Sequence, residues 1–170
     1  WNTSNVTNMS SMFKDARAFN KSLNGWDTSK VTNMSGMFSA SYNAASPAFN
    51  SDISQWDTSS VTHMSSMFAY ARNFNKRVSD WNTSNVVDMQ HMFYHATGFN
   101  NGDYDGPSQW DTSKVTTFRT IFWGCSVNNM DVSTWNVSNA TDTHGMFVGN
   151  TNFNRDVSNW DILFISKLYF

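Results

Sequence analysis

The sequence predicts a right-handed α/β solenoid with one short parallel strand and one helix in each repeat. Tryptophan recurs at intervals of 25, 30, 25, 29, 25 and 25 residues, and a similar phrase follows each one. Trp1 opens WNTSNVTNMSSMF and Trp26 opens WDTSKVTNMSGMF. Self-similarity at such a period is typical of stacked repeats, in which each unit packs only on its neighbours. Six full repeats begin at Trp1, Trp26, Trp56, Trp81, Trp110 and Trp135, and a partial one begins at Trp160.

The helix is expected after the polar start of each repeat. Counting each Trp as position 0, apolar residues stand at +5, +8, +11 and +12, which are Val6, Met9, Met12 and Phe13 in the first repeat. At helical spacing they cover an arc of about 120°, the apolar stripe of a one-sided helix. The Asn-Thr-Ser or Asp-Thr-Ser run before them supplies side chains that cap a first turn.

The strand is expected just before the next Trp. A Phe-Asn pair is followed by Leu, Ile or Val three residues before the Trp, as in Phe49-Asn50 and Ile53. Such a residue between short polar ones suits a brief strand. The recurring Asn predicts a buried ladder that satisfies backbone groups, and the recurring Met predicts core filling rather than a soft-metal site.

Composition narrows the class of protein. The chain has 170 residues, a net charge of −2 and only 11 Lys plus Arg, so it has no basic footprint for nucleic acid. One Cys excludes an intrachain disulfide, and no apolar run approaches the roughly 20 residues that span a bilayer. We expect a single domain over residues 1–170 that is a fragment of a longer chain.

The repeated phrase resembles one known family. The pattern W-[DN]-T-S-x-V-T-x-M-x-x-M-F followed by F-N-x-x-[IV]-S-x-W is similar to the BspA-like leucine-rich-repeat surface proteins, including mycoplasma-type lipoproteins. The resemblance implies a leucine-rich-repeat-like solenoid, display at the cell surface or outside the cell, and adhesion or protein binding. It implies no active site, so we expect a protein that is not an enzyme. The fifth and sixth repeats depart from the pattern, with Phe118, Ile121 and Thr143 in Met slots.

Two insertions between helix and strand interrupt the period, at residues 41–47 and 100–108. The second contains Asn101, Asp103 and Asp105, which alternate like the first ligands of a calcium loop. Thr112 stands where the bidentate Glu is expected, so an Asn/Asp/Gly-rich turn is the competing interpretation and no other cofactor is expected. His91 and His95 have a zinc-compatible spacing without a third ligand in the same repeat, which favours surface histidines.

The positions after the Met-Phe pair vary and hold several aromatic residues in neighbouring repeats. If they are exposed together, they form a binding patch of the composition that hot spots favour. The alternative is that they only cover helix ends and the inserted loop. The candidate binding residues are Tyr70, Arg72, Tyr94, His95 and Trp123.

The tail WDILFISKLYF lacks the polar cap of the other repeats. A solenoid end exposes its core unless it is capped. The tail is therefore a cap, a truncation stump or a docking edge for another subunit, and the missing polar outer face favours the stump or the docking edge. The docking edge would be formed by Leu163, Phe164, Leu168 and Phe170.

These observations favour a non-enzymatic protein-interaction module on a surface-displayed repeat protein. The alternative is a scaffold subunit that docks into a larger assembly through its C-terminal end. An ice- or glycan-binding array is a third hypothesis, although its threonines stand where caps belong and Val137 breaks the row. That array would comprise Thr3, Thr28, Thr58, Thr83 and Thr112.

Overall fold

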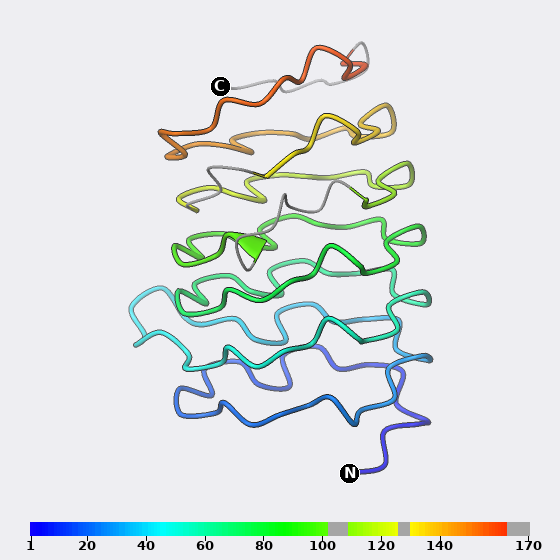
Figure 1. The fold of residues 1–170 in the computed structure, drawn as a ribbon, viewed down its shortest axis with the longest axis vertical. Helices are drawn as coiled ribbons and strands as arrows, with labels where there is room; N and C mark the ends of the chain where they lie inside the picture. Colours follow the sequence, from blue (N-terminus) through cyan, green and yellow to red (C-terminus); the bar gives the residue numbers. More distant parts are fainter. Residues whose placement is uncertain (102–108, 126–129, 163–170) are drawn as a thin grey trace.

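The repeats stack as successive coils along the long axis of the molecule, one coil per repeat (Figure 1). The computed structural model describes residues 1–101, 109–125 and 130–162. Parallel bridges join neighbouring coils at position +7, namely Asn8–Asn33, Asn33–His63, His63–Asp88, Asp88–Thr117 and Thr117–Asp142. The sequence period therefore corresponds to one layer of the stack.

The predicted strand-plus-helix unit is wrong. Within the described ranges the chain forms no α-helix and no strand longer than an isolated bridge, apart from a short 3-10 turn at Asn101. The fold is therefore not an α/β leucine-rich-repeat solenoid, and each coil is a chain of turns.

Left-handed residues explain why the helix does not form. The residue at position +10 has a positive φ in all six coils, between 47° and 63°. These residues are Ser11, Gly36, Ser66, His91, Thr120 and Gly145. A residue in the left-handed region cannot continue a right-handed helix. It therefore interrupts any right-handed helix inside the stretch that carries the apolar pattern.

The backbone hydrogen bonds of the fourth coil show what replaces the helix. The amides of Met92 and Tyr94 donate three residues back, to the carbonyls of Met89 and His91 at 3.2 and 3.0 Å. The alternate amide of Phe93 donates to the carbonyl of Ile121 in the next coil at 2.9 Å. Successive amides thus bond within the coil and between coils in turn, so the backbone is satisfied without regular secondary structure.

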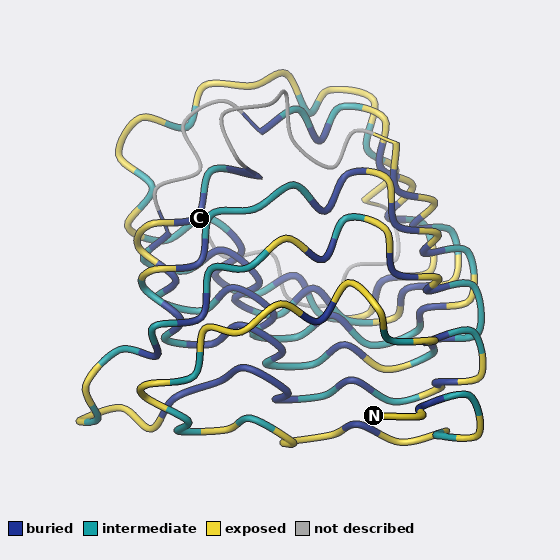
Figure 2. Cartoon of the chain, turned by 60° about the horizontal axis from the view of Figure 1, so that its bottom comes forward, coloured by how far each residue is buried: buried dark blue, intermediate teal, exposed yellow. Residues whose placement is uncertain are grey.

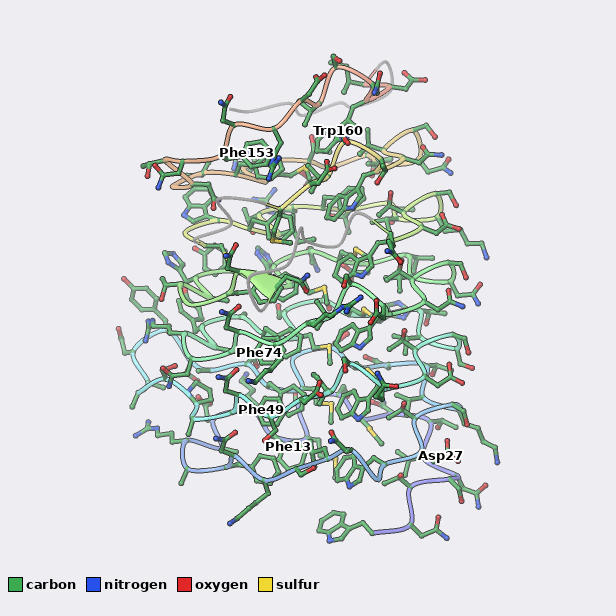
Figure 3. The ribbon with its side chains drawn as sticks, viewed as in Figure 1. Phe13, Asp27, Phe49, Phe74, Phe153 and Trp160 are labelled. Atoms are coloured by element: carbon green, nitrogen blue, oxygen red, sulfur yellow. The ribbon has the colours of Figure 1, made fainter. Side chains whose placement is uncertain are left out.

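Stacked aromatic rings fill the interior, as the repeated apolar positions predict. The Phe side chains at +12 stack through the whole series, with centroid distances of 5.6, 5.7, 5.4, 5.7 and 5.9 Å. A second column lies against it, and Phe49, Phe74 and Phe153 of that column appear one above another inside the stack (Figure 3). The two columns contact each other closely, as in Phe93–Phe99 at 4.0 Å.

The predicted role of the methionines in the core is confirmed, with one exception at the first coil. Eight of the nine ladder methionines are 4% exposed or less, whereas Met12 is 40% exposed. The first coil also leaves Trp1 91% exposed, and Figure 2 shows more exposed chain there than in the middle coils. In the first coil, Met12 and Phe13 are therefore less covered than their counterparts in the middle coils, although Met9 is buried.

The Thr at +2 joins coils instead of capping helices. Thr28, Thr58, Thr83 and Thr112 are each 1% exposed, and their hydroxyls donate to a carbonyl of the next coil at 2.9–3.0 Å. The hypothesis of an ice- or glycan-binding array on this row is wrong, because the threonine hydroxyls are buried and already hydrogen-bonded.

The Asn after each inner Phe forms the predicted ladder, but the ladder is not buried as expected, because Asn20 is exposed and Asn50 and Asn75 are half-buried. The Oδ1 atoms of Asn20, Asn50 and Asn75 each accept the backbone amide of the Asn one coil further on, at 2.8–2.9 Å. This ladder therefore links neighbouring coils in the segment between each inner Phe and the next Trp.

Turn carboxylates at +1 predict an acid-sensitive stability. The Ser59 hydroxyl and then its amide hold the pKa of Asp57 below its ordinary value. Because the folded pKa is the lower one, this stabilisation is present above the unfolded pKa and is lost as the pH falls below about 4. Asp57→Asn introduces the residue type that the fourth repeat has at the same position, Asn82. We expect this variant to lose less thermal stability than the wild type when the pH falls from neutral to acidic. An unchanged pH profile of the melting temperature would contradict this.

Candidate functional site

One aromatic ring from each of five successive coils forms a continuous row on the surface. Neighbouring rings in this row are 5.7, 5.4, 6.2 and 6.4 Å apart between centroids. We call it the aromatic ladder, and its members are Tyr42, Tyr70, Tyr94, Trp123 and His144. Tyr42 is 69% exposed and the other four are half-buried. The structure therefore brings together all the aromatic residues of the predicted patch.

A second left-handed position places this row. Position +14 has a positive φ in most coils, including 59° at Tyr70 and 53° at His95. In the fourth coil, Phe93 at +12 is buried, whereas Tyr94 at +13 and His95 at +14 are half-buried at the surface. The ladder members come from +13, +14, +9 and the first insertion, and hydrogen bonds between the coils hold these positions beside one another.

The His95 ring lies inside this row rather than apart from it. It is parallel to the Tyr70 ring at 5.3 Å and edge-on to the Tyr94 ring at 4.6 Å. On its other side it covers Gly124, where a Cβ atom would approach the His95 Nδ1 to 2.6 Å. A glycine with φ of +66° thus allows the ring to lie directly on the backbone of the next coil.

Trp123 is seated in the same way one coil further on. A Cβ atom on Gly145 would lie 2.7 Å from Trp123 Cε3, so only glycine leaves room for the indole there. Rings held on both sides keep few alternative rotamers, which lowers the entropy that a partner must freeze on binding. The row is therefore a preorganised aromatic surface.

Arg72 supplies a positive charge at the ladder. Its guanidinium lies 5.6 Å from the Tyr70 ring centroid, a cation–π geometry. The two ion pairs among the described residues, Arg77–Asp80 and Arg119–Asp142, do not involve it. Its charge is thus held in place beside the rings without a carboxylate partner from the part of the chain that is described.

The first insertion braces this surface. Ser41 donates from its amide and hydroxyl to the Asp15 carboxylate at 2.7 and 2.8 Å, and the Ser46 hydroxyl accepts the Arg72 amide at 3.0 Å. The loop is thereby tied to the coils on either side of its own. Its Tyr42 extends the ladder, so the insertion is part of the site and not only a tolerated change of loop length.

The ladder predicts an altered titration of His95. Burial, and then the Arg72 charge, hold the pKa of His95 below its ordinary value. Its contribution to stability is therefore present above the unfolded pKa and is lost as the pH falls through the folded one. In an NMR titration we expect His95 to titrate below an exposed histidine, and Arg72→Ala to raise its pKa part of the way back. No change in Arg72→Ala would show that the two groups do not interact.

The other predicted sites fare differently. Asn101 is fully buried, and its Oδ1 accepts the Val78 amide at 2.8 Å, so it has a structural bond in place of a free ligand position. Asp103 and Asp105 lie outside the described residues, as do the tail residues Leu163, Phe164, Leu168 and Phe170. Over the described ranges, no group of three or more His, Cys or Asp side chains is placed to hold a metal ion.

His91 belongs to the surroundings of the ladder. Its Nδ1 hydrogen-bonds with the Thr120 hydroxyl, and its ring stands edge-on to Tyr94 at 5.4 Å. Burial, followed by the charge of Arg119, lowers its pKa. Its contacts thus go to neighbouring coils, in place of the predicted exposed position or a zinc pair with His95.

Sequence reasoning missed two ladder members. Tyr42 stands in an insertion, where the repeat gives no register, and His144 stands at +9, a position that elsewhere holds Ser, Gln or Arg. The start of the insertion directly after the +14 position was the available signal for Tyr42. No repeat pattern marked His144.

Comparison with known proteins identifies the family. The model of the family described as "Mycoplasma protein of unknown function, DUF285" matches residues 1–47, 42–107 and 102–169. The chain belongs to this family. Its three consecutive matches agree with a repeat protein of mycoplasma type. No curated protein and no solved structure gives a significant match.

The part of the chain that is described contains no helix of the length and apolarity that crossing a membrane requires.

Proposed function

We propose that this chain is a non-enzymatic recognition module that binds a protein partner through the aromatic ladder. The observation that supports this is the row of five half-buried or exposed rings, continuous across five coils, with the Arg72 guanidinium over one of them. Tyr, Trp and Arg dominate the residues that carry binding energy in protein interfaces. Their clustering here is more than the stack needs, since the Phe columns already fill its interior.

The seating of the rings supports the same proposal. Trp123 lies on Gly145 and His95 lies on Gly124, so the neighbouring coils already hold both rings in place. Rigid aromatic side chains provide a large contact area at a small entropic cost. The sequence resemblance to BspA-like surface proteins supports display at the cell surface, although this chain does not share their α/β architecture.

Paired variants test the proposal. Partners are captured by photo-crosslinking from cells and fluids of the source organism, identified by mass spectrometry, and their affinity is then measured with purified proteins. We expect Tyr94→Ala combined with Trp123→Ala to weaken binding by about 100-fold or more, because two hot-spot side chains are removed.

The matched control is Lys30→Ala combined with Lys114→Ala. Both lysines lie on the exposed turns at +4, where their Nζ atoms bond to Asn5 and Asn85 of a neighbouring coil at 2.8 and 2.7 Å. This pair is expected to leave affinity unchanged. Equal affinity of the ladder variant and the wild type for every captured partner would refute the proposal.

A further inference from the structure

We propose that the outer side of the first coil binds a further coil of the same repeat from another chain, stacked in the same direction as the coils of this molecule. This side, which we call the open face, carries Trp1, Met12 and Phe13 and lies at the N-terminal end of the stack (Figure 1). The inference goes beyond the proposed function and does not depend on it, since every member of the aromatic ladder belongs to a later coil.

All five junctions between the described coils share one hydrogen-bond pattern. Amides at +8, +10, +12 and +14 donate to the carbonyls at +7, +9, +11 and +13 of the next coil, at 2.7–3.2 Å. The amide at +6 donates in the opposite direction, as from Thr32 to Thr7 at 2.8 Å. Over the segment from +7 to +14, each coil therefore has an acceptor side that faces the N-terminal end of the stack and a donor side that faces the C-terminal end.

The open face is an acceptor side that no described coil covers. The carbonyl oxygens at its four acceptor positions receive no hydrogen bond from a described residue, and the Thr7 amide at +6 donates none. These carbonyls belong to Asn8, Ser10, Met12 and Lys14. Two open faces do not complement each other, because carbonyl would meet carbonyl at four positions. The donor side of a coil, in contrast, supplies an amide for each of these carbonyls.

The side chains of the open face are also uncovered. Trp1 is 91% and Met12 40% exposed, whereas the equivalent Met37 of the second coil is fully buried. Phe13 is half-buried, but its counterpart Phe38 is 1% exposed because Phe13 itself stacks on it at 5.6 Å. A further coil on the open face would bury Met12 and Phe13 in the same way, and burial of apolar surface is the main driving force of association.

An indole group adds a directional contact. In later coils the Trp Nε1 donates to the carbonyl of the residue three before the preceding Trp, from Trp56 to Leu23 at 3.3 Å and from Trp81 to Ile53 at 3.1 Å. The Nε1 atom of Trp26 bonds to no described residue. The last residues of a coil stacked on the open face would bring a carbonyl to this nitrogen.

These contacts specify the occupant. It must offer amides at four alternate positions, a Phe ring above Phe13 and a carbonyl for Trp26, and a coil with the Met-x-x-Met-Phe pattern offers all three. No described segment of this chain reaches back over the open face, so we assign the occupant to another chain. Binding of this kind is β-augmentation, in which main-chain bonds supply affinity and side-chain pockets supply specificity.

The test uses a fluorescein-labelled peptide of residues 56–80, a repeat without an insertion, and anisotropy with the full chain. We expect one peptide to bind per chain. N-methylation of the Phe68 amide, which donates to Met92 in this molecule, removes a bond to the open face and should weaken binding about 10-fold or more. The matched control is N-methylation of the Ser65 amide, which donates to no described residue, and it should leave the affinity unchanged.

Substitutions at the two ends of the stack locate the site. Met12→Lys places an ammonium group in the junction and should weaken peptide binding by at least about 10-fold. Ile162→Lys, at a 45% exposed residue beyond Trp160, should have no effect. If near-UV circular dichroism shows that Met12→Lys is unfolded, Trp1→Ala replaces it, and this loss of a 91% exposed ring should also weaken binding. Equal affinities of all these variants would overturn the proposal.

A fusion distinguishes a coil of another chain from an attached coil as the occupant. Residues 56–80 placed directly before Trp1 recreate the natural join between Asp80 and Trp81. We expect the fusion to melt at a higher temperature than the chain alone and to bind no peptide, because the attached coil covers the open face. A stabilised fusion together with a chain that binds no peptide would mean that only an attached coil fits, and the proposal would be wrong. An unchanged melting temperature of the fusion would show that the face does not accept a coil at all.

Discussion

Replacement of Phe93 by Ala is expected to destabilise the protein by about 3–5 kcal/mol, the usual cost of removing a fully buried aromatic ring. Phe93 is 0% exposed and stacks on Phe68 at 5.4 Å, Phe122 at 5.7 Å and Phe99 at 4.0 Å. Its loss leaves a cavity that both adjacent coils line. For a chain of this length the melting temperature should fall by on the order of 10 °C.

Phe13→Ala is the matched control. It removes the same ring from the same column, but Phe13 is half-buried and has a coil on one side only. We therefore expect a smaller loss, measured by chemical denaturation of both variants. Equal losses at the two positions would show that the interior column does not carry the stability of the stack.

Replacement of Gly145 by Ala is expected to destabilise the protein by about 2–3 kcal/mol, since it combines left-handed strain with a collision. Gly145 has a φ of +62°, and an added Cβ would meet Trp123 Cε3 at 2.7 Å. The opposite change at the equivalent position, Ser66→Gly, should be neutral or stabilising. Ser66 has a φ of +55°, which glycine adopts without strain, and its amide can keep the bond to Gln90 O.

The signs of these two changes in the free energy of unfolding distinguish a left-handed turn from a helix. In a helix interior, Gly145→Ala would stabilise by up to about 1 kcal/mol and Ser66→Gly would destabilise by roughly half that. Both variants can be measured by the same denaturant titration. A gain at Gly145→Ala together with a loss at Ser66→Gly would mean that the left-handed turns are wrong.

The sequence predicted the layers and the interior of this protein because both depend on recurrence. The Trp period sets one coil per repeat, and repeated inward positions place Phe74 and Met92 in the core whatever the backbone does between them. The candidate patch was predictable for the same reason, since Tyr94 and Trp123 occupy the same position of consecutive repeats.

The local backbone could not be predicted from that pattern. Apolar residues at +8, +11 and +12 suit a helix and equally suit turns that return to the interior three and four residues later. The distinguishing signal was at +10, which holds glycine in two repeats (Gly36 and Gly145) and other residues, such as Ser66 and His91, in the rest. Gly at a fixed position indicates a left-handed residue, but Ser and His there hide it. The backbone of each coil follows from bonds to its neighbours, which a single repeat does not reveal.

The central claim is that left-handed residues, at +10 in every coil and at +14 in most coils, shape the turns beside which the aromatic ladder lies. Solution NMR of backbone chemical shifts and HN–Hα couplings over residues 60–75 and 85–98 tests it most directly. We predict left-handed values at Ser66, Tyr70, His91 and His95, each between residues with negative φ. Unbroken helical shifts through Ser66 and His91 would contradict the claim, and with it the geometry of the proposed binding surface.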